Sequence, residues 1–205
     1  MTGKTTERAG YHHGDLPAAL TAAAIELLDE RGMDQVTVRE VARRAGVSPG
    51  APFRHFADRQ ALLTAVADRI LADFAQWQIG MVAGAEGSVM RAFGLGFVRF
   101  AIRHPRRFEL IRTRVFADGR PAELHQRLTD IERAFTDVIV ADQKAGVLRP
   151  GDPAAVGLAG QALVYGLSQM IVDGYLPPDR AEQLAEQVLD TFGTGIANSP
   201  GPAGP

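Results

Sequence analysis

The 205-residue sequence predicts an all-α protein, because apolar residues recur three and four positions apart along it and no segment shows the alternation of a β-strand. Glycines and prolines interrupt this pattern at intervals that correspond to helices of ordinary length. The hydrophobic fraction, 46 %, and the charged fraction, 22 %, are typical of a soluble globular protein. A domain has roughly 100–200 residues, so the chain has room for one or two.

Start and stop signals delimit the first two helices. Asp15 can cap the first helix, and Gly32 ends it, because glycine tolerates the left-handed conformation found after a helix. The second helix opens with Thr-Val-Arg-Glu, a capping box in which the side chains of Thr37 and Glu40 bond to each other's backbone amides. It ends at Gly46. Both helices are therefore predicted from local chemistry alone.

A sharp reversal follows the second helix. Residues 45–48, Ala-Gly-Val-Ser, predict a tight turn between two helices of about eight residues, which is a helix-turn-helix. The third helix begins at Pro49, and Phe53 and Phe56 are its predicted apolar anchors. Pro52 has no amide to donate, so we expect the first turn of this helix to be loose or 3-10.

The rest of the chain predicts longer helices. Asp58 can cap a helix that runs to about residue 81. Glycine and proline breaks divide the remainder into helices near residues 87–103, 105–117, 121–145, 153–173 and 179–196. The tail, residues 197–205, is rich in proline and glycine and has little to bury, so we expect it to be disordered.

The composition excludes several kinds of site. The chain has no cysteine, which excludes disulfides, thiolate zinc sites and cysteine nucleophiles. Residues 46–50 fit the Gly-x-Ser-x-Gly pattern of hydrolases, but that motif must follow a strand, and these residues follow a helix. No glutamate has a histidine three positions later, as di-iron bundles require. We therefore expect no enzyme activity, no cofactor and no metal.

We expect the protein to be cytoplasmic and not to bind membranes. No apolar run approaches the roughly 18 residues of a membrane span, and residues 1–14 lack the apolar core of a secretory signal.

The net charge of the chain is −2, but one local stretch has an excess of positive charge. Between Arg39 and Arg59, five arginines face two acids, for a net of +3. Such a stretch is informative only if the fold turns the arginines toward one partner.

The predicted helix-turn-helix resembles the DNA-binding domain of TetR-family transcriptional regulators. The similarity is specific over residues 11–65 and rests on the segments TVREVA at 37–42, AGVS at 45–48, FRHF at 53–56 and Leu62-Leu63. The opening YHHGDL, residues 11–16, is similar to a subgroup with a WHG-type C-terminal domain. The tryptophan and histidine positions of that subgroup correspond here to Gln161 and Tyr165.

The resemblance implies a homodimer with about nine helices in each chain. A flexible arm at 1–10 would precede a DNA-binding domain at 11–60 and an effector-binding and dimerisation domain at 61–196. The predicted DNA-binding residues are Thr37, Arg39, Ser48, Pro49, Gly50, Ala51, Phe53, Arg54, His55 and Arg59.

These residues have different predicted roles at the DNA. The small residues at the start of the third helix permit close approach to the major groove but cannot form bidentate bonds to bases. Base reading is therefore assigned mainly to Arg39 and then to Arg54, and phosphate contacts to Thr37, Ser48 and His55. Phe53 stands where the family usually has a tyrosine, and Arg59 where it usually has a lysine. The charges of Arg43 and Arg44 are expected to be solvated.

The second domain is rich in aromatic residues. Most of them are expected to form an ordinary helical core, and together they also predict an apolar effector pocket with a few polar contacts. The residues assigned to the pocket are Phe93, Phe97, Phe100, Phe108, Ile111, Arg112, Gln161, Tyr165 and Met170. The residues assigned to the dimer interface, which the resemblance places on the last two helices, are Leu158, Ala162, Gln169, Leu184, Val188 and Phe192.

The resulting hypothesis is a dimeric repressor that a small apolar effector releases from a pseudo-palindromic double-stranded operator. Dimers place two recognition helices on half-sites one helical turn, or a multiple, apart. Two alternatives remain open. One is a helical ligand carrier or enzyme that uses a borrowed helix-turn-helix domain, and the other is a sequence-tolerant architectural protein. The near-neutral net charge disfavours the second, because non-specific binding depends on many phosphate contacts.

Overall fold

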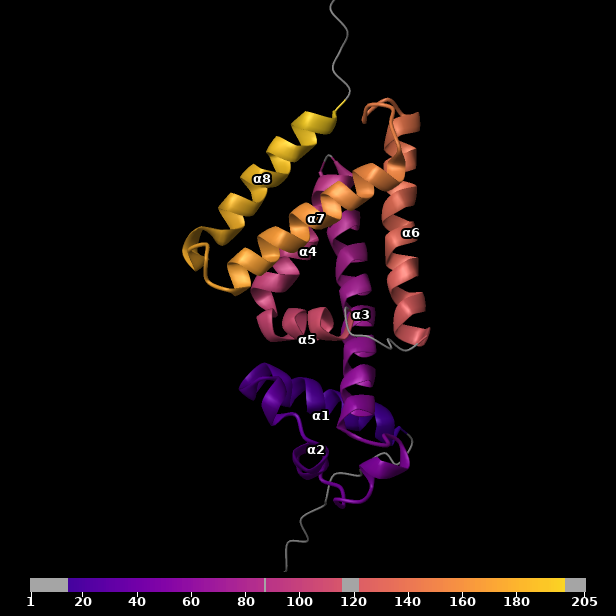
Figure 1. The fold of residues 1–205 in the computed structure, drawn as a ribbon, viewed down its shortest axis with the longest axis vertical. Coiled ribbons are helices and arrows are strands. Elements are labelled where there is room, and N and C mark those ends of the chain that lie inside the picture. Colours follow the sequence, from indigo (N-terminus) through magenta and orange to yellow (C-terminus); the bar gives the residue numbers. More distant parts are fainter. Residues whose placement is uncertain (1–14, 87, 116–121, 198–205) are drawn as a thin grey trace, which may run out of the picture. The chain divides into compact units, whose positions relative to one another are not determined.

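Helices account for the regular structure of the chain, and the all-α prediction is confirmed (Figure 1). The computed structural model describes residues 15–86, 88–115 and 122–197. These ranges contain eight α-helices and three short 3-10 helices, close to the nine helices expected. The chain forms two units, residues 1–66 and 67–205, whose boundary falls within one helix.

The first unit is formed by short helices around a small core. Its elements are α1 (Leu16–Arg31), the 3-10 helix η1 (Met33–Gln35), α2 (Val38–Arg44), the 3-10 helix η2 (Pro52–Arg54) and the first part of α3 (Arg59–Ala83). The predicted caps are present: Asp15 Oδ1 accepts from the amide of Ala18 at 3.1 Å, and Asp58 Oδ1 from that of Ala61 at 2.8 Å. Its fully buried side chains include Leu20, Leu27, Leu28, Val36, Val41, Leu62 and Leu63.

The third predicted helix is wrong in its length. Residues 49–50 form a turn, and only the three residues of η2 are helical, instead of about eight. The amides of Ala51 and His55 bond three residues back, to Ser48 and Pro52, at 3.0 and 2.9 Å. Pro52 has no amide, so it cannot make the first α-helical bond, to the carbonyl of Ser48, of a helix that starts at Pro49. The 3-10 first turn expected from Pro52 is confirmed.

The second unit is a bundle in which α4 packs against several other helices. Its elements after α3 are α4 (Val89–Arg103), α5 (Pro105–Val115), α6 (Ala122–Lys144), α7 (Pro153–Val172), the 3-10 helix η3 (Pro178–Arg180) and α8 (Ala181–Ile196). Helix α4 contacts α5, α6, α7 and α8, and in Figure 1 α7 crosses α4 while α8 returns beside α7. The core between α4, α7 and α8 contains Leu95, Val98, Val164, Leu167, Ile171, Ala185 and Leu189.

Side chains of α3 fix the approach of α4. Trp77 Nε1 donates to the carbonyl of Gly96 at 2.9 Å, and Gln78 Nε2 donates to that of Phe93 at 3.0 Å. A Cβ atom on Gly96 would lie 2.1 Å from Gln78 Oε1 and 3.0 Å from Met81 Cγ. Only a glycine therefore allows the two helices to lie this close.

Some expectations concern residues outside the described ranges. The flexible arm at 1–10 and residues 198–205 of the predicted disordered tail lie there, as do His12 and His13. Ala197, the first residue of that predicted tail, is described and forms an isolated antiparallel bridge with Leu148.

Candidate nucleic-acid interface and ligand cavity

The turn after α2 is built by backbone bonds that require a glycine. Gly46 has a φ of +70°, a left-handed conformation that residues with a Cβ rarely adopt. The amide of Val47 donates to the carbonyl of Ala42 at 3.0 Å, and the amide of Gly46 to that of Arg43 at 3.3 Å. These bonds close the end of α2, and Ser48 follows directly.

The capping box predicted at the start of α2 is only half formed. Thr37 Oγ1 accepts from the amide of Glu40 at 3.2 Å, as predicted. The Glu40 carboxylate does not return to Thr37, because it pairs with Arg43 and Arg31, and the amide of Thr37 donates to the carbonyl of Gln35 instead. The hydrogen bond from Arg43 lowers the pKa of Glu40 below its ordinary value.

The residues predicted to meet DNA lie mostly on the surface of the first unit. All but Ala51 and Arg59, which are partly buried, are exposed: Thr37, Arg39, Ser48, Pro49, Gly50, Phe53, Arg54 and His55. From the start of α2 to the end of η2, the structure thus places most of the predicted DNA-binding residues on the surface of the first unit. Their contacts with DNA stay a prediction.

The arginines of this stretch divide into paired and unpaired groups. Arg44 pairs with Glu30 and, at 3.2 Å, with Glu26, and the hydrogen bond from Arg44 lowers the pKa of Glu30. Arg43 Nε donates to Glu40 at 2.9 Å. Within residues 15–86, 88–115 and 122–197, Arg39 and Arg54 have neither a hydrogen bond nor an ion pair. The charge that is free to meet an anion is therefore on the two arginines assigned to base reading.

Arg59 and Phe53 are placed in ways that the sequence did not predict. Arg59 Nε donates to the carbonyl of Val36 at 2.8 Å and its Nη2 to that of Met33 at 2.7 Å, so its guanidinium holds the loop before α2. Phe53 is 57 % exposed, and the prediction that it anchors the third helix is wrong. Phe56, 7 % exposed, is the anchor.

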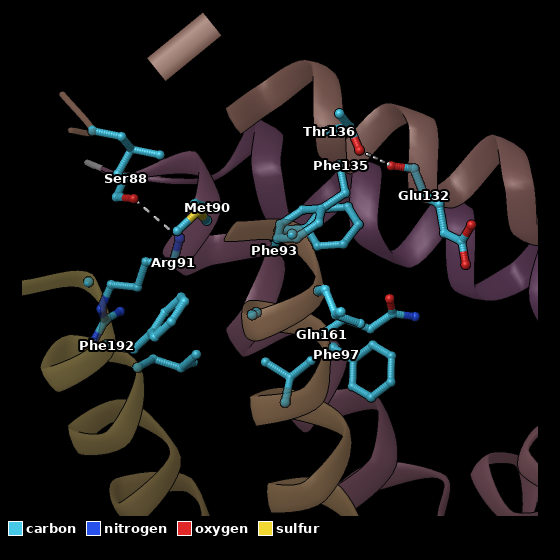
Figure 2. A pocket seen from close by; sticks show the side chains of 18 of the residues that line it. Ser88, Met90, Arg91, Phe93, Phe97, Glu132, Phe135, Thr136, Gln161 and Phe192 are labelled. Carbon is cyan, nitrogen blue, oxygen red and sulfur yellow. Dashed lines mark hydrogen bonds between the residues drawn. The ribbon is translucent and has the colours of Figure 1, made fainter. Parts of the chain in front are cut away.

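A large cavity lies in the second unit, between α4, α6, α7 and α8. Its volume is about 750 Å³, within the range of small-molecule sites. The rings of Phe93 and Phe135 stack at a centroid distance of 4.8 Å in its wall, and Figure 2 shows them facing each other. Arg91 Nε donates to Asp190 at 2.5 Å beside it, which lowers the pKa of Asp190.

A second, smaller cavity adjoins the first. Its volume is about 100 Å³, and its wall includes Phe100, Phe108, Ile111, Arg112 and Tyr165. The two cavities share lining residues from α3, α4, α6 and α7, which are Phe74, Phe97, Ile131, Glu132 and Gln161.

Eight of the nine residues assigned to the effector pocket line one of these cavities or both. Met170 lines neither and is 39 % exposed. The sequence reasoning did not assign Phe135, Leu189 or Asp190, which also line the large cavity. The aromatic character of Phe135 was its only sequence signal, and nothing local marks the other two.

The residues assigned to the dimer interface are mixed in exposure. Leu158 is 68 % exposed and also lines the large cavity, and Ala162 is exposed. Gln169 and Leu184 are half-buried, and the amide of Gln169 donates to Asp173 at 2.7 Å. The two remaining side chains, Val188 and Phe192, pack against the core.

Comparison with known families decides what this architecture is. A model described as bacterial regulatory proteins, tetR family, matches residues 20–66. A model described as a tetracyclin repressor-like C-terminal domain matches residues 90–192, half of the chain. The chain belongs to the TetR family. The description of the second match does not name the WHG-type subgroup, so the family is confirmed and the subgroup stays a prediction.

Individual relatives of this TetR-family chain agree. It is 42 % identical over 57 residues to the tetracycline repressor protein class A from transposon 1721 of Escherichia coli, covering 28 % of this chain and 26 % of the relative. It is 32 % identical over 82 residues to the class D repressor of E. coli, covering 40 % and 38 %. The chain thus spans well under half the length of these curated relatives.

A solved structure covers almost the whole TetR-family chain. A protein of unknown function from Rhodococcus sp. RHA1 has a TM-score of 0.83 and 30 % identity, covering 93 % of this chain and all of that one. The matching family is described as bacterial regulatory proteins, and the comparisons point to transcriptional regulators rather than to enzymes. In the described part of the chain, no three His, Asp or Glu side chains are grouped so that they could hold a metal ion.

Proposed function

We propose that this chain is a homodimeric repressor that binds a pseudo-palindromic operator and is released by a small, largely apolar effector. The observation that carries the DNA-binding part is that Arg39 and Arg54 are exposed and form no ion pair with any described residue, on a helix-turn-helix that matches the tetR family. Nearby Arg43 and Arg44 are neutralised by glutamates. An unpaired arginine can form the bidentate contact that reads a guanine.

The cavity supports the effector part of the proposal. A space of about 750 Å³ with walls of phenylalanine and aliphatic side chains suits an apolar molecule of drug size. An effector that favours the DNA-free state must bind that state more tightly, and a 100-fold loss of operator affinity requires about 2.7 kcal/mol of coupling.

The character of α7 supports the dimer. The expectation that no apolar run approaches the length of a membrane span is wrong for α7, which is long and apolar enough to cross a membrane, with a mean hydropathy of 1.4 over its most apolar window, of which 28 % is buried. One side of α7, which includes Val164, Leu167 and Ile171, is buried in the core. The helix cannot enter a membrane without exposing that core. We assign the exposed face around Leu158 and Ala162 to a second copy of the chain, in a protein that works in the cytoplasm.

The DNA-binding proposal is tested with two arginine variants of α2. Footprinting of the DNA that flanks the coding region first locates the operator, and gel-shift titration at fixed salt then measures affinity. Arg39→Ala should weaken operator binding by tenfold or more and relax preference at one base pair, since a base contact provides about 1–3 kcal/mol of discrimination.

The matched control is Arg43→Ala, which removes the same charge four residues along α2. Its guanidinium is already bound to Glu40, so operator affinity should change by less than threefold. Equal losses for the two variants would contradict the assignment of Arg39 as the base reader. A ligand carrier that uses a borrowed helix-turn-helix would show no footprint at all.

A further inference from the structure

The smaller cavity has a different chemistry from the larger one. Its walls are aromatic, with Phe108 and Phe97 at a centroid distance of 6.0 Å and Phe108 and Tyr165 at 5.8 Å. Arg112 from α5 completes it, and the Tyr165 hydroxyl forms a hydrogen bond with Arg112. Burial raises the pKa of Tyr165 above its ordinary value, so the phenol is a neutral donor at physiological pH.

Arg112 lacks a compensating charge. Its Nε is buried without a hydrogen-bond acceptor, and in the described ranges no carboxylate forms an ion pair with its guanidinium. Arg112 is half-buried, so part of its charge is removed from water, and an anion bound beside it would offset that desolvation. Glu132 lines both cavities but is exposed and does not pair with Arg112. The small cavity therefore favours an anion from outside the chain.

The two cavities share part of their lining. Gln161 and Phe97 line both spaces, and the Gln161 amide has no partner in the part of the chain that the structure describes. Figure 2 places Gln161 and Phe97 toward one side of the large cavity, and Ser88, Arg91 and Phe192 toward the other. A ligand that fills the large cavity can thus extend past Gln161 toward Arg112.

The volumes limit what each part can hold. The small cavity, about 100 Å³, has space for a small polar group such as a carboxylate. The large cavity, about 750 Å³, has room for the apolar body. The charged end of the ligand is therefore small and terminal.

We propose that the effector is an amphipathic carboxylate, whose apolar body fills the large cavity and whose carboxylate binds Arg112 and Tyr165 in the small one. This rests on the proposed function in treating the cavities as the effector site. Arginine and a phenol hydroxyl together offer the donors that a carboxylate accepts, and both side chains are half-buried, where charge-assisted hydrogen bonds are stronger than in bulk water.

The test is direct binding of three probes that differ only in their head group. Calorimetry of the full chain with decanoate, decan-1-ol and decylamine, below their aggregation concentrations, should show decanoate binding at least tenfold tighter than either of the others. Equal affinity for decanoate and decan-1-ol, or no binding of decanoate, would overturn the proposal. Tightest binding of decylamine would assign the site to Glu132 and a cation, and would overturn it as well.

Substitutions locate the charge that is responsible. Arg112→Gln should reduce decanoate affinity to that of decan-1-ol while leaving decan-1-ol unchanged, and Arg112→Lys should retain most of the preference. Arg180→Gln, which removes an exposed arginine outside both cavities, is the control and should have no effect. A decanoate preference that survives in Arg112→Gln would refute the assignment. Unchanged decan-1-ol binding shows that the variant is folded.

Failure of this inference is distinguishable from failure of the proposed function. A protein that binds its operator but does not prefer decanoate keeps the regulator and loses the carboxylate site. A protein that shows an Arg112-dependent preference for decanoate but binds no operator keeps the site and loses the repressor.

Discussion

Replacing Gly96 with alanine would place a methyl group where α3 and α4 are in contact. The new Cβ would lie 2.1 Å from Gln78 Oε1 and 3.0 Å from Met81 Cγ, and contacts below 3.0 Å force a neighbour to move. Gln78 is only 4 % exposed, and its Nε2 donates to the carbonyl of Phe93. Its side chain cannot turn away without losing that bond.

The size of the effect follows from three contributions. Overpacking costs about 1–3 kcal/mol, and the lost hydrogen bond about 1 kcal/mol. The higher helix propensity of alanine offsets about 1 kcal/mol of this. We therefore expect Gly96→Ala to lower the free energy of unfolding by about 1–3 kcal/mol. For a chain of this size, each 1 kcal/mol lowers Tm by about 2–4 °C.

The matched control is Gly80→Ala, also in a helix interior but with open space around its Cβ position. It should raise stability by about 0.5–1 kcal/mol, because only the propensity term remains. Calorimetric or circular-dichroism melting at one protein concentration measures both variants. A Gly96→Ala protein that melts at or above the wild-type Tm would refute the close approach of α3 and α4.

Two further predictions concern the first unit. Arg59→Met keeps the apolar stem but removes the bonds to the carbonyls of Val36 and Met33, so amide exchange around η1 should accelerate and stability should fall by about 1–2 kcal/mol; unchanged exchange would contradict this role. Arg44→Gln removes the hydrogen bond that lowers the pKa of Glu30, so an NMR titration should show that pKa rising toward 4.5. The lowered pKa of Glu30 stabilises the folded state at pH values above the pKa that this group has in the unfolded state. This stabilisation is lost as the pH falls through the folded-state pKa. The stability of the variant should therefore depend less on pH between these two pKa values. An identical Glu30 titration in both proteins would exclude the pair in solution.

The helices that local chemistry defines were predicted well. The first helix lies within a residue of its predicted bounds, because Asp15 and Gly32 supply a cap and a stop. The break at Pro105 likewise separates α4 from α5 as expected. The third helix was overestimated, since the turn signal at Pro49 was clear but the bonding at Pro52 limits the segment to one 3-10 turn.

Tertiary partners were beyond reach of the sequence. The spacing of Phe93 and Phe97 placed them on one side of a helix, but only the fold shows that Phe135, from a distant helix, stacks on Phe93. Arg59 was assigned only to the DNA, because local spacing cannot show that two loop carbonyls accept hydrogen bonds from its guanidinium. A cavity forms where the side chains of packed helices leave a gap, and the packing of helices that are distant in sequence cannot be predicted from a local sequence pattern.

The two prolines around the η2 segment have a consequence for recognition. Each ring fixes φ near −65°, so the loop between Ser48 and Phe53 has few alternative shapes in the unbound protein. Little backbone freedom is then lost when the loop meets a partner, which favours tight association. In the proposed DNA contact, the same stiffness would prevent the loop from adjusting to an ill-fitting site, so an incorrect DNA site would have to deform or be rejected.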